Sequence, residues 1–130
     1  YIFKLNLNKK IKIFTNISDQ EKYFYLKRSN CFLFPSCSKA EAYGLAQLEA
    51  MAFSLPIINT KLNNGVNFLV PCKNCLTIKA SSVNDLRDAI IKIRQNKSLF
   101  LNLNKKSYEQ YKNINSINIK EEINNIFINY

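Results

Sequence analysis

Short apolar runs recur along the chain and predict β-strands. Residues 31–34 are wholly apolar and end at Pro35, and residues 57–60 begin directly after Pro56. A run of this kind is typical of a strand that helices cover on both faces of a parallel sheet. Residues 76–78 form a shorter candidate strand.

Two more stretches near the start of the chain carry strand-like patterns. Residues 11–15 are rich in β-forming side chains. Phe3, Leu5 and Leu7 alternate with polar residues, which fits either a strand or the end of a helix followed by a loop.

A capping box predicts the first helix. Ser18 can bond the third amide of a helix while Glu21 reaches back to the amide of Ser18. We therefore expect a helix over residues 19–29, with Tyr23 and Leu26 facing inward.

Apolar residues at helical spacing predict further helices. They are Leu45, Leu48, Met51, Ala52 and Leu55 in one helix, which Pro56 ends, and Leu86, Ala89, Ile90 and Ile93 in another, behind a cap at Ser82. Two more helices are expected over residues 98–112 and 119–129. Strands that alternate with helices across short connections predict an α/β fold with a parallel sheet and right-handed crossovers.

Composition narrows the possible chemistry. The 130 residues suffice for one domain and include no histidine, which excludes a Ser-His-Asp triad or a histidine-ligated metal within this sequence. No apolar run reaches the roughly 18 residues of a membrane span, and no signal-peptide pattern is present. We therefore expect a cytoplasmic protein. The first residue is tyrosine, which leaves open whether the chain starts where its gene starts.

The net charge of +10 has more than one interpretation. A basic domain can bind nucleic acid, an anionic membrane or a phosphorylated substrate. Most of the 19 basic residues are lysine, whose A/T-rich codons favour mutational drift as the main cause. The arginines, Arg28, Arg87 and Arg94, are scattered rather than interleaved with aromatic residues. We expect no nucleic-acid partner, although a basic nucleic-acid-binding module remains the alternative to an enzyme.

The stretch 34–52 joins the end of a predicted strand to the start of a helix. Ligands bind at this edge of open parallel sheets. Free amides at the helix start favour a phosphate group, and Gly44 permits close approach of the backbone.

Two glutamates in this stretch can face the same crevice. Glu41 would be buried if the helix included it, so we place it on the preceding loop, and Glu49 falls at the edge of the apolar stripe. Their separation, on the order of 10 Å, is too long for a nucleophile and acid acting on one bond, but it suits two anchors on an elongated ligand. The alternative is that Glu41 caps the helix with Ser38 and that Glu49 is a solvated surface residue.

Residues 34–58 resemble a family signature. Pro35-Ser36, Glu41-Ala42-Tyr43-Gly44-Leu45, Glu49-Ala50-Met51-Ala52 and Leu55-Pro56-Ile57-Ile58 are similar in order and spacing to the E-x7-E motif of retaining GT-B glycosyltransferases, glycosyltransferase family 4 (group 1). The resemblance covers about residues 11–95. It implies the C-terminal, Rossmann-like half of a GT-B enzyme, which binds a nucleotide-sugar donor.

The resemblance also implies roles for individual residues. Glu41 would be the catalytic-site residue that contacts hydroxyl groups of the transferred sugar. The stretch from Ala42 to Leu45 would bind the donor, with the backbone amides of Tyr43, Gly44 and Leu45 facing the sugar and diphosphate. Glu49 would hold the ribose hydroxyl groups.

Domain organisation and partners follow from the same resemblance. It implies a partial donor-binding domain over residues 1–112, a C-terminal helix over 113–130, and an acceptor-binding N-terminal domain outside this sequence. A sugar or lipid-linked acceptor, peripheral contact with the cytoplasmic face of a membrane, and a role in cell-envelope polysaccharide or glycolipid synthesis are expected. The helix dipole and basic groups would replace a metal cofactor at the diphosphate. The isolated chain is expected to be inactive, and a degenerate gene remnant is a further alternative.

The four cysteines raise other possibilities. Cys72 and Cys75 have C-x-x-C spacing, which would suit a zinc site or a redox pair together with Cys31 and Cys37. A second C-x-x-C is missing, so we favour free, reduced thiols. Cys75 also stands where the family usually has a glycine, which predicts a strained turn with positive φ.

Overall fold

Three parallel strands form the sheet of the computed structural model, which describes residues 2–38, 44–62, 67, 70–71 and 74–116. The strands are β1 (Phe32–Phe34), β2 (Ile57–Thr60) and β3 (Leu76–Ile78), in the order β1-β2-β3. Leu33 lies opposite Ile58, and Ile58 lies opposite Leu76. The parallel sheet and these three strands confirm the expectation from the apolar runs.

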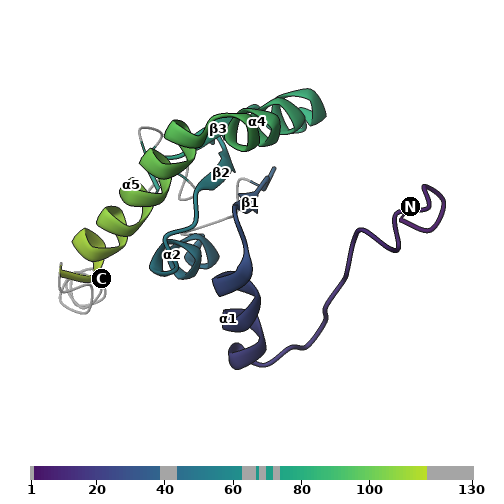
Figure 1. The fold of residues 1–130 in the computed structure, drawn as a ribbon, viewed down its shortest axis with the longest axis horizontal. Helices are drawn as coiled ribbons and strands as arrows, with labels where there is room; N and C mark the ends of the chain where they lie inside the picture. Colours follow the sequence, from purple (N-terminus) through teal and green to yellow (C-terminus); the bar gives the residue numbers. More distant parts are fainter. Residues whose placement is uncertain (1, 39–43, 63–66, 68–69, 72–73, 117–130) are drawn as a thin grey trace, which may run out of the picture.

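Helices cover both faces of this sheet (Figure 1). They are α1 (Asp19–Arg28), α2 (Leu45–Ala52), α4 (Val83–Gln95) and α5 (Lys97–Ser116). The arrangement is the predicted Rossmann-like one, a parallel sheet with flanking helices.

Successive side chains of β2 point to opposite faces of the sheet, and the core therefore consists of two clusters. Ile57 points into a cluster with Ala50 and Met51 of α2, and Ile58 points into a cluster with Ala89 and Ile93 of α4. Both isoleucines are fully buried, as expected for the central strand of a covered parallel sheet.

The predicted helix caps are confirmed. Glu21 Oε2 accepts a hydrogen bond of 2.9 Å from the Ser18 amide, and Ser18 Oγ accepts one of 3.3 Å from the Glu21 amide. Ser82 Oγ accepts a bond of 3.2 Å from the Asp85 amide and caps α4.

The helix predicted over 98–112 is present as α5 and continues to Ser116. The helix predicted over 119–129 lies outside the described residues, so the division at residue 112 stays a prediction. Asn63-Asn64-Gly65, a sequence that predicts a turn, also lies outside them.

The N-terminal residues differ from the prediction. Residues 11–15 form no strand, and the stretch from Phe3 to Leu7 is a series of turns rather than a strand. Residues 2–17 extend away from the sheet (Figure 1). A strand needs hydrogen bonds from a neighbouring strand, and no other strand in the described part of the chain lies beside residues 11–15.

Two predicted core positions are partly exposed. Leu33 is 41% exposed because α4 packs on β3 and β2 and leaves the adjacent face of the edge strand β1 open. Tyr23 is 42% exposed, although its ring lies 5.8 Å from that of Phe53, whereas Leu26 is buried as predicted.

Cys75 does not adopt the strained turn that its position suggested. The positive-φ residues of the described chain are Asn6, Asn16, Gly44, Ser54 and Ser81. Cys75 is instead a buried member of the core cluster that contains Ile57.

Candidate functional site

The N-terminus of α2 lies just after Gly44, which as the N-cap residue provides no side-chain cap. Gly44 has φ 60° and ψ 47°, in the left-handed region, and a Cβ there would lie 2.5 Å from Gln47 Nε2. The positive φ therefore favours glycine, and a Cβ would in addition displace the Gln47 amide. The first turn contains no acidic residue, so no side chain of that turn compensates the partial positive charge of this helix end.

The buried face of α2 differs from the predicted stripe. Leu45 is 65% exposed, whereas Gln47, Ala50 and Met51 are fully buried. Gln47 is buried because its Oε1 accepts a hydrogen bond of 2.9 Å from Asn59 Nδ2 on β2. This bond compensates for the burial of both amides, so the helix can turn a polar residue toward the sheet.

The amide contacts continue into the loop after β2. Asn67 Nδ2 donates to Asn59 Oδ1 at 3.4 Å, and Asn67 Oδ1 accepts from the Leu62 amide at 2.8 Å. Cys75 Sγ also donates to Asn59 Oδ1, at 3.4 Å. The first turn of α2 is thus tied to β2 and to the loop that follows β2 at the carboxyl edge of the sheet.

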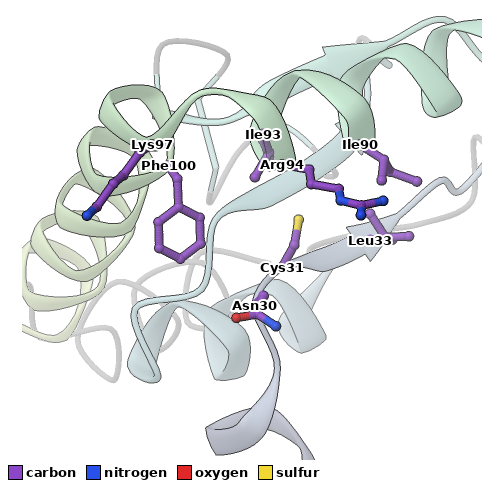
Figure 2. A pocket seen from close by; sticks show the side chains of 8 residues that line it. All are labelled: Asn30, Cys31, Leu33, Ile90, Ile93, Arg94, Lys97 and Phe100. Carbon is purple, nitrogen blue, oxygen red and sulfur yellow. The ribbon is translucent and has the colours of Figure 1, made fainter.

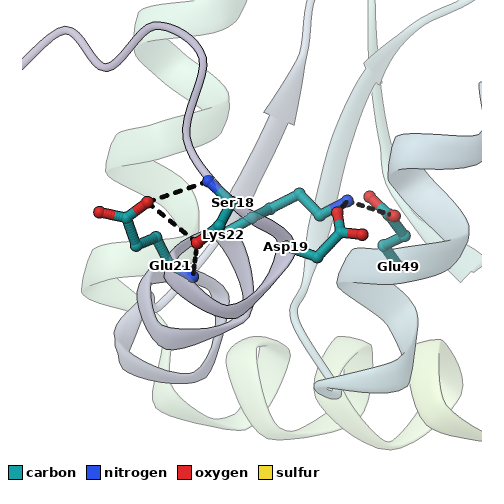
Figure 3. Close-up of polar contacts among 5 residues, drawn as sticks. All are labelled: Ser18, Asp19, Glu21, Lys22 and Glu49. Atoms are coloured by element: carbon teal, nitrogen blue, oxygen red, sulfur yellow. Dashed lines mark hydrogen bonds and ion pairs between the residues drawn. The ribbon is translucent and has the colours of Figure 1, made fainter.

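Glu49 lies on α2 and forms an ion pair with α1. Its Oε1 is 2.7 Å from Lys22 Nζ, which is also 2.8 Å from Asp19 Oδ1 (Figure 3). The Glu49 side chain is 35% exposed and that of Lys22 33%. Hydrogen bonds to Asp19 and Glu49 raise the pKa of Lys22 above its ordinary value, so it is fully protonated at neutral pH. Glu49 is therefore held by a cation rather than freely solvated.

The structure describes some of the site residues that the sequence predicts. Gly44 and Leu45 form the start of α2, and Glu49 follows one turn later. Glu41, Ala42 and Tyr43 lie outside the described residues, so their positions and the separation of the two glutamates stay predictions. Sequence patterns did not identify Lys22, Gln47 or Asn59, whose partners lie far away in the sequence.

A groove of about 680 Å³ lies elsewhere, between β1 and the junction of α4 with α5 (Figure 2). Cys31, Ile90 and Phe100 give it an apolar lining, with Arg94 and Lys97 as its cations. It lies beside the amino end of β1. Because nucleotides bind at the carboxyl ends of parallel strands, this groove is distinct from the predicted site.

The thiols differ in their surroundings. Burial raises the pKa of Cys31 to about 11, whereas a hydrogen bond from Ser81 Oγ lowers the pKa of the exposed Cys37. Cys75 is buried, and Cys72 lies outside the described residues. Within the described ranges, no three cysteine or acidic side chains are gathered as a metal site.

No helix within the described ranges has the length and apolar character of a membrane span.

Comparisons with known proteins agree with this architecture. Residues 1–113 match the family model described as "Glycosyl transferases group 1". A curated relative, O-antigen chain mannosyltransferase C from Escherichia coli, is 31% identical over 58 residues, which are 44% of this chain and 16% of the relative. Sucrose-phosphate synthase from Thermosynechococcus elongatus, a solved structure, matches with a TM-score of 0.78 and 21% identity. The match covers 99% of this chain and 33% of that chain, so the sequence spans a minor part of either protein's length.

Proposed function

Because the chain belongs to the group 1 glycosyl transferases, we propose that residues 34–52 bind a nucleotide-sugar donor. The full-length protein that contains them would transfer the sugar to an acceptor, with retention of configuration. The base of the donor, whether guanine, uracil or adenine, is left open.

The observation that carries the proposal is the start of α2 at the carboxyl edge of the parallel sheet, where the N-cap residue Gly44 provides no side-chain cap. Backbone amides at a helix N-terminus bind anions through hydrogen bonds and the helix dipole. Gly44 has no side chain to block a close approach, and Leu45 is exposed beside it. We therefore place the donor diphosphate against Gly44 and Leu45.

Glu49 supports the same placement. It lies one turn into α2 and keeps about a third of its side chain exposed. A carboxylate can accept hydrogen bonds from two hydroxyl groups, and such charge-assisted bonds are the stronger ones. We assign Glu49 to the ribose hydroxyl groups.

The family signature extends the proposal to the preceding loop. Glu41 would contact hydroxyl groups of the transferred sugar, and the backbone of Ala42 and Tyr43 would lie along the donor. We propose that the helix dipole and basic groups stabilise the diphosphate, so that transfer needs no divalent cation. EDTA should then leave the rate of transfer largely unchanged, and restoration of a lost activity by added Mg²⁺ or Mn²⁺ would contradict this part of the proposal.

The acceptor and location are proposed on other grounds. The relative from Escherichia coli is named as an O-antigen chain mannosyltransferase, which favours a sugar or lipid-linked acceptor in envelope polysaccharide or glycolipid synthesis. A net charge of +10 suits contact with the anionic cytoplasmic face of a membrane.

A donor panel tests the proposal. The full-length protein would be incubated with radiolabelled GDP-, UDP- and ADP-sugars and lipid acceptor extracts, and label in the acceptor would be measured. We expect transfer from one donor class, strongly reduced in Glu41→Gln and retained in Glu109→Gln, a matched loss of charge on α5. Retention on heparin with no donor binding would favour the nucleic-acid-binding alternative.

A further inference from the structure

We propose that Lys22 is a positioning residue of the donor site, which holds one carboxylate oxygen of Glu49 so that the other faces the ribose. This inference rests on the proposed function. It adds a residue on α1 to the ribose contact proposed for Glu49 on α2.

The geometry is that of a clamped carboxylate. Lys22 Nζ lies 2.7 Å from Glu49 Oε1 and 2.8 Å from Asp19 Oδ1 (Figure 3). An ammonium group has three donors, so both bonds form at once. Glu49 Oε2 has no hydrogen bond among the described residues, and a carboxylate held at one oxygen keeps the acceptor sites of the other.

The lysine is itself fixed by its surroundings. Asp19 lies one turn before it on α1, and the capping box at Ser18 and Glu21 defines the start of that helix. The ammonium also lies 5.1 Å from the centre of the Tyr23 ring, which stabilises a cation.

The two helices are joined beside this ion pair. Leu26 of α1 is buried in the same cluster as Ala50 and Met51 of α2, and Tyr23 contacts Phe53 at the end of α2. The packing of α1 on α2 therefore determines where Lys22 holds Glu49. A preorganised acceptor loses less freedom when the ligand binds.

A comparison of nucleotides with and without ribose hydroxyl groups distinguishes a positioning role of Lys22 from a merely structural one. The full-length protein would be titrated with the best-binding nucleoside diphosphate of a GDP, UDP and ADP panel, and with its 2′,3′-dideoxy form. The ratio of the two dissociation constants measures the contribution of the hydroxyl groups. We expect a ratio of about tenfold or more in the unsubstituted protein, since a charge-assisted hydrogen bond has that effect on affinity.

Three variants complete the test. Lys22→Met should reduce the ratio to about twofold by weakening only the ribose-containing ligand. Lys22→Arg should restore most of it. Lys27→Met, a matched loss of an exposed lysine elsewhere on α1, should leave the ratio unchanged.

An equal loss of affinity for both ligands in Lys22→Met, or no loss, would overturn the positioning role while leaving the donor site in place. Failure of the unsubstituted protein to bind any of the three nucleotides would overturn both this inference and the proposed function.

Discussion

Gln47 on α2 and Asn59 on β2 are joined by a hydrogen bond of 2.9 Å in the interior between helix and sheet. Both side chains are fully buried, and Gln47 Nε2 occupies the space that a side chain at Gly44 would enter. This bond fixes the rotation of α2 about its axis. As a result, the start of the helix meets the carboxyl edge of the sheet with Leu45 outward and Gly44 beneath the proposed diphosphate position.

Substitutions at the two ends of α2 should change stability in opposite directions. Gly44 and Ser54 both have positive φ, 60° and 59°, where a Cβ costs about 1–2 kcal/mol. Gly44→Ala should therefore lower the free energy of unfolding by at least about 1–2 kcal/mol. Ser54→Gly should raise it by up to about 1 kcal/mol, because relief of strain outweighs the added freedom of the unfolded chain.

Denaturant titrations of the two variants check this prediction. Equal effects of the same sign would show that the left-handed conformations at Gly44 and Ser54 are not those of the folded protein.

Two buried hydroxyl groups provide another contrast. Thr60 Oγ1 is buried and has no hydrogen-bond partner among the described residues, whereas Ser107 Oγ donates to the Leu55 carbonyl over 2.7 Å. Thr60→Val should stabilise the protein by about 1 kcal/mol, and Ser107→Ala should destabilise it by a similar amount. Thermal unfolding monitored by circular dichroism measures both. Destabilisation by Thr60→Val would indicate that the hydroxyl group has a partner in solution.

The cysteines should react with iodoacetamide at different rates. Only the thiolate reacts, so Cys37, whose pKa is lowered by Ser81, should be alkylated faster than Cys31 and should reach its maximal rate below the pH typical of a free thiol. The pKa of Cys31 is raised to about 11 by burial, so its slow rate should still be rising at about pH 10. Mass spectrometry of the labelled peptides resolves the two sites. Similar pH profiles at Cys31 and Cys37 would contradict their assigned surroundings.

Much of the fold could be predicted from local signals. The runs at 31–34 and 57–60 stand beside prolines that end or begin them, and serine caps precede α1 and α4. These features act over a few residues, so the sequence alone reveals them. The prediction of a strand at residues 11–15 was wrong. A strand forms only beside a neighbouring strand, and local composition does not reveal whether such a neighbour is available.

The helix that carries the proposed site was predictable only where the spacing of residues defines it. The start of α2 at Gly44 and the placement of Glu49 on that helix follow from the sequence. The rotation of α2 does not, because its apolar stripe suggested that Leu45 faces the core and gave no sign of the Gln47–Asn59 bond. Lys22 was missed for the same reason, since its partner lies 27 residues away on another helix.

Residues 1–130 alone should not catalyse transfer. In the proposed two-domain enzyme the acceptor approaches from the other domain, and orientation of two substrates can contribute about 7–11 kcal/mol to lowering the barrier. The open face of β1 beside Leu33 should also favour association of the isolated chain. Sugar transfer and donor hydrolysis would be assayed beside the full-length protein after a cooperative melt is confirmed. Comparable turnover by residues 1–130 would contradict the division of substrates between domains.

The most direct test of the donor site is a calorimetric titration of the full-length protein and its Glu49→Ala variant with the preferred nucleoside diphosphate. We predict that the variant binds about tenfold to a hundredfold more weakly, because it loses charge-assisted hydrogen bonds to the ribose. Its melting temperature should change little, since Glu49 lies at the partly exposed edge of α2, and Glu109→Ala should bind normally. Unchanged affinity in Glu49→Ala would contradict the assignment of α2 to the donor.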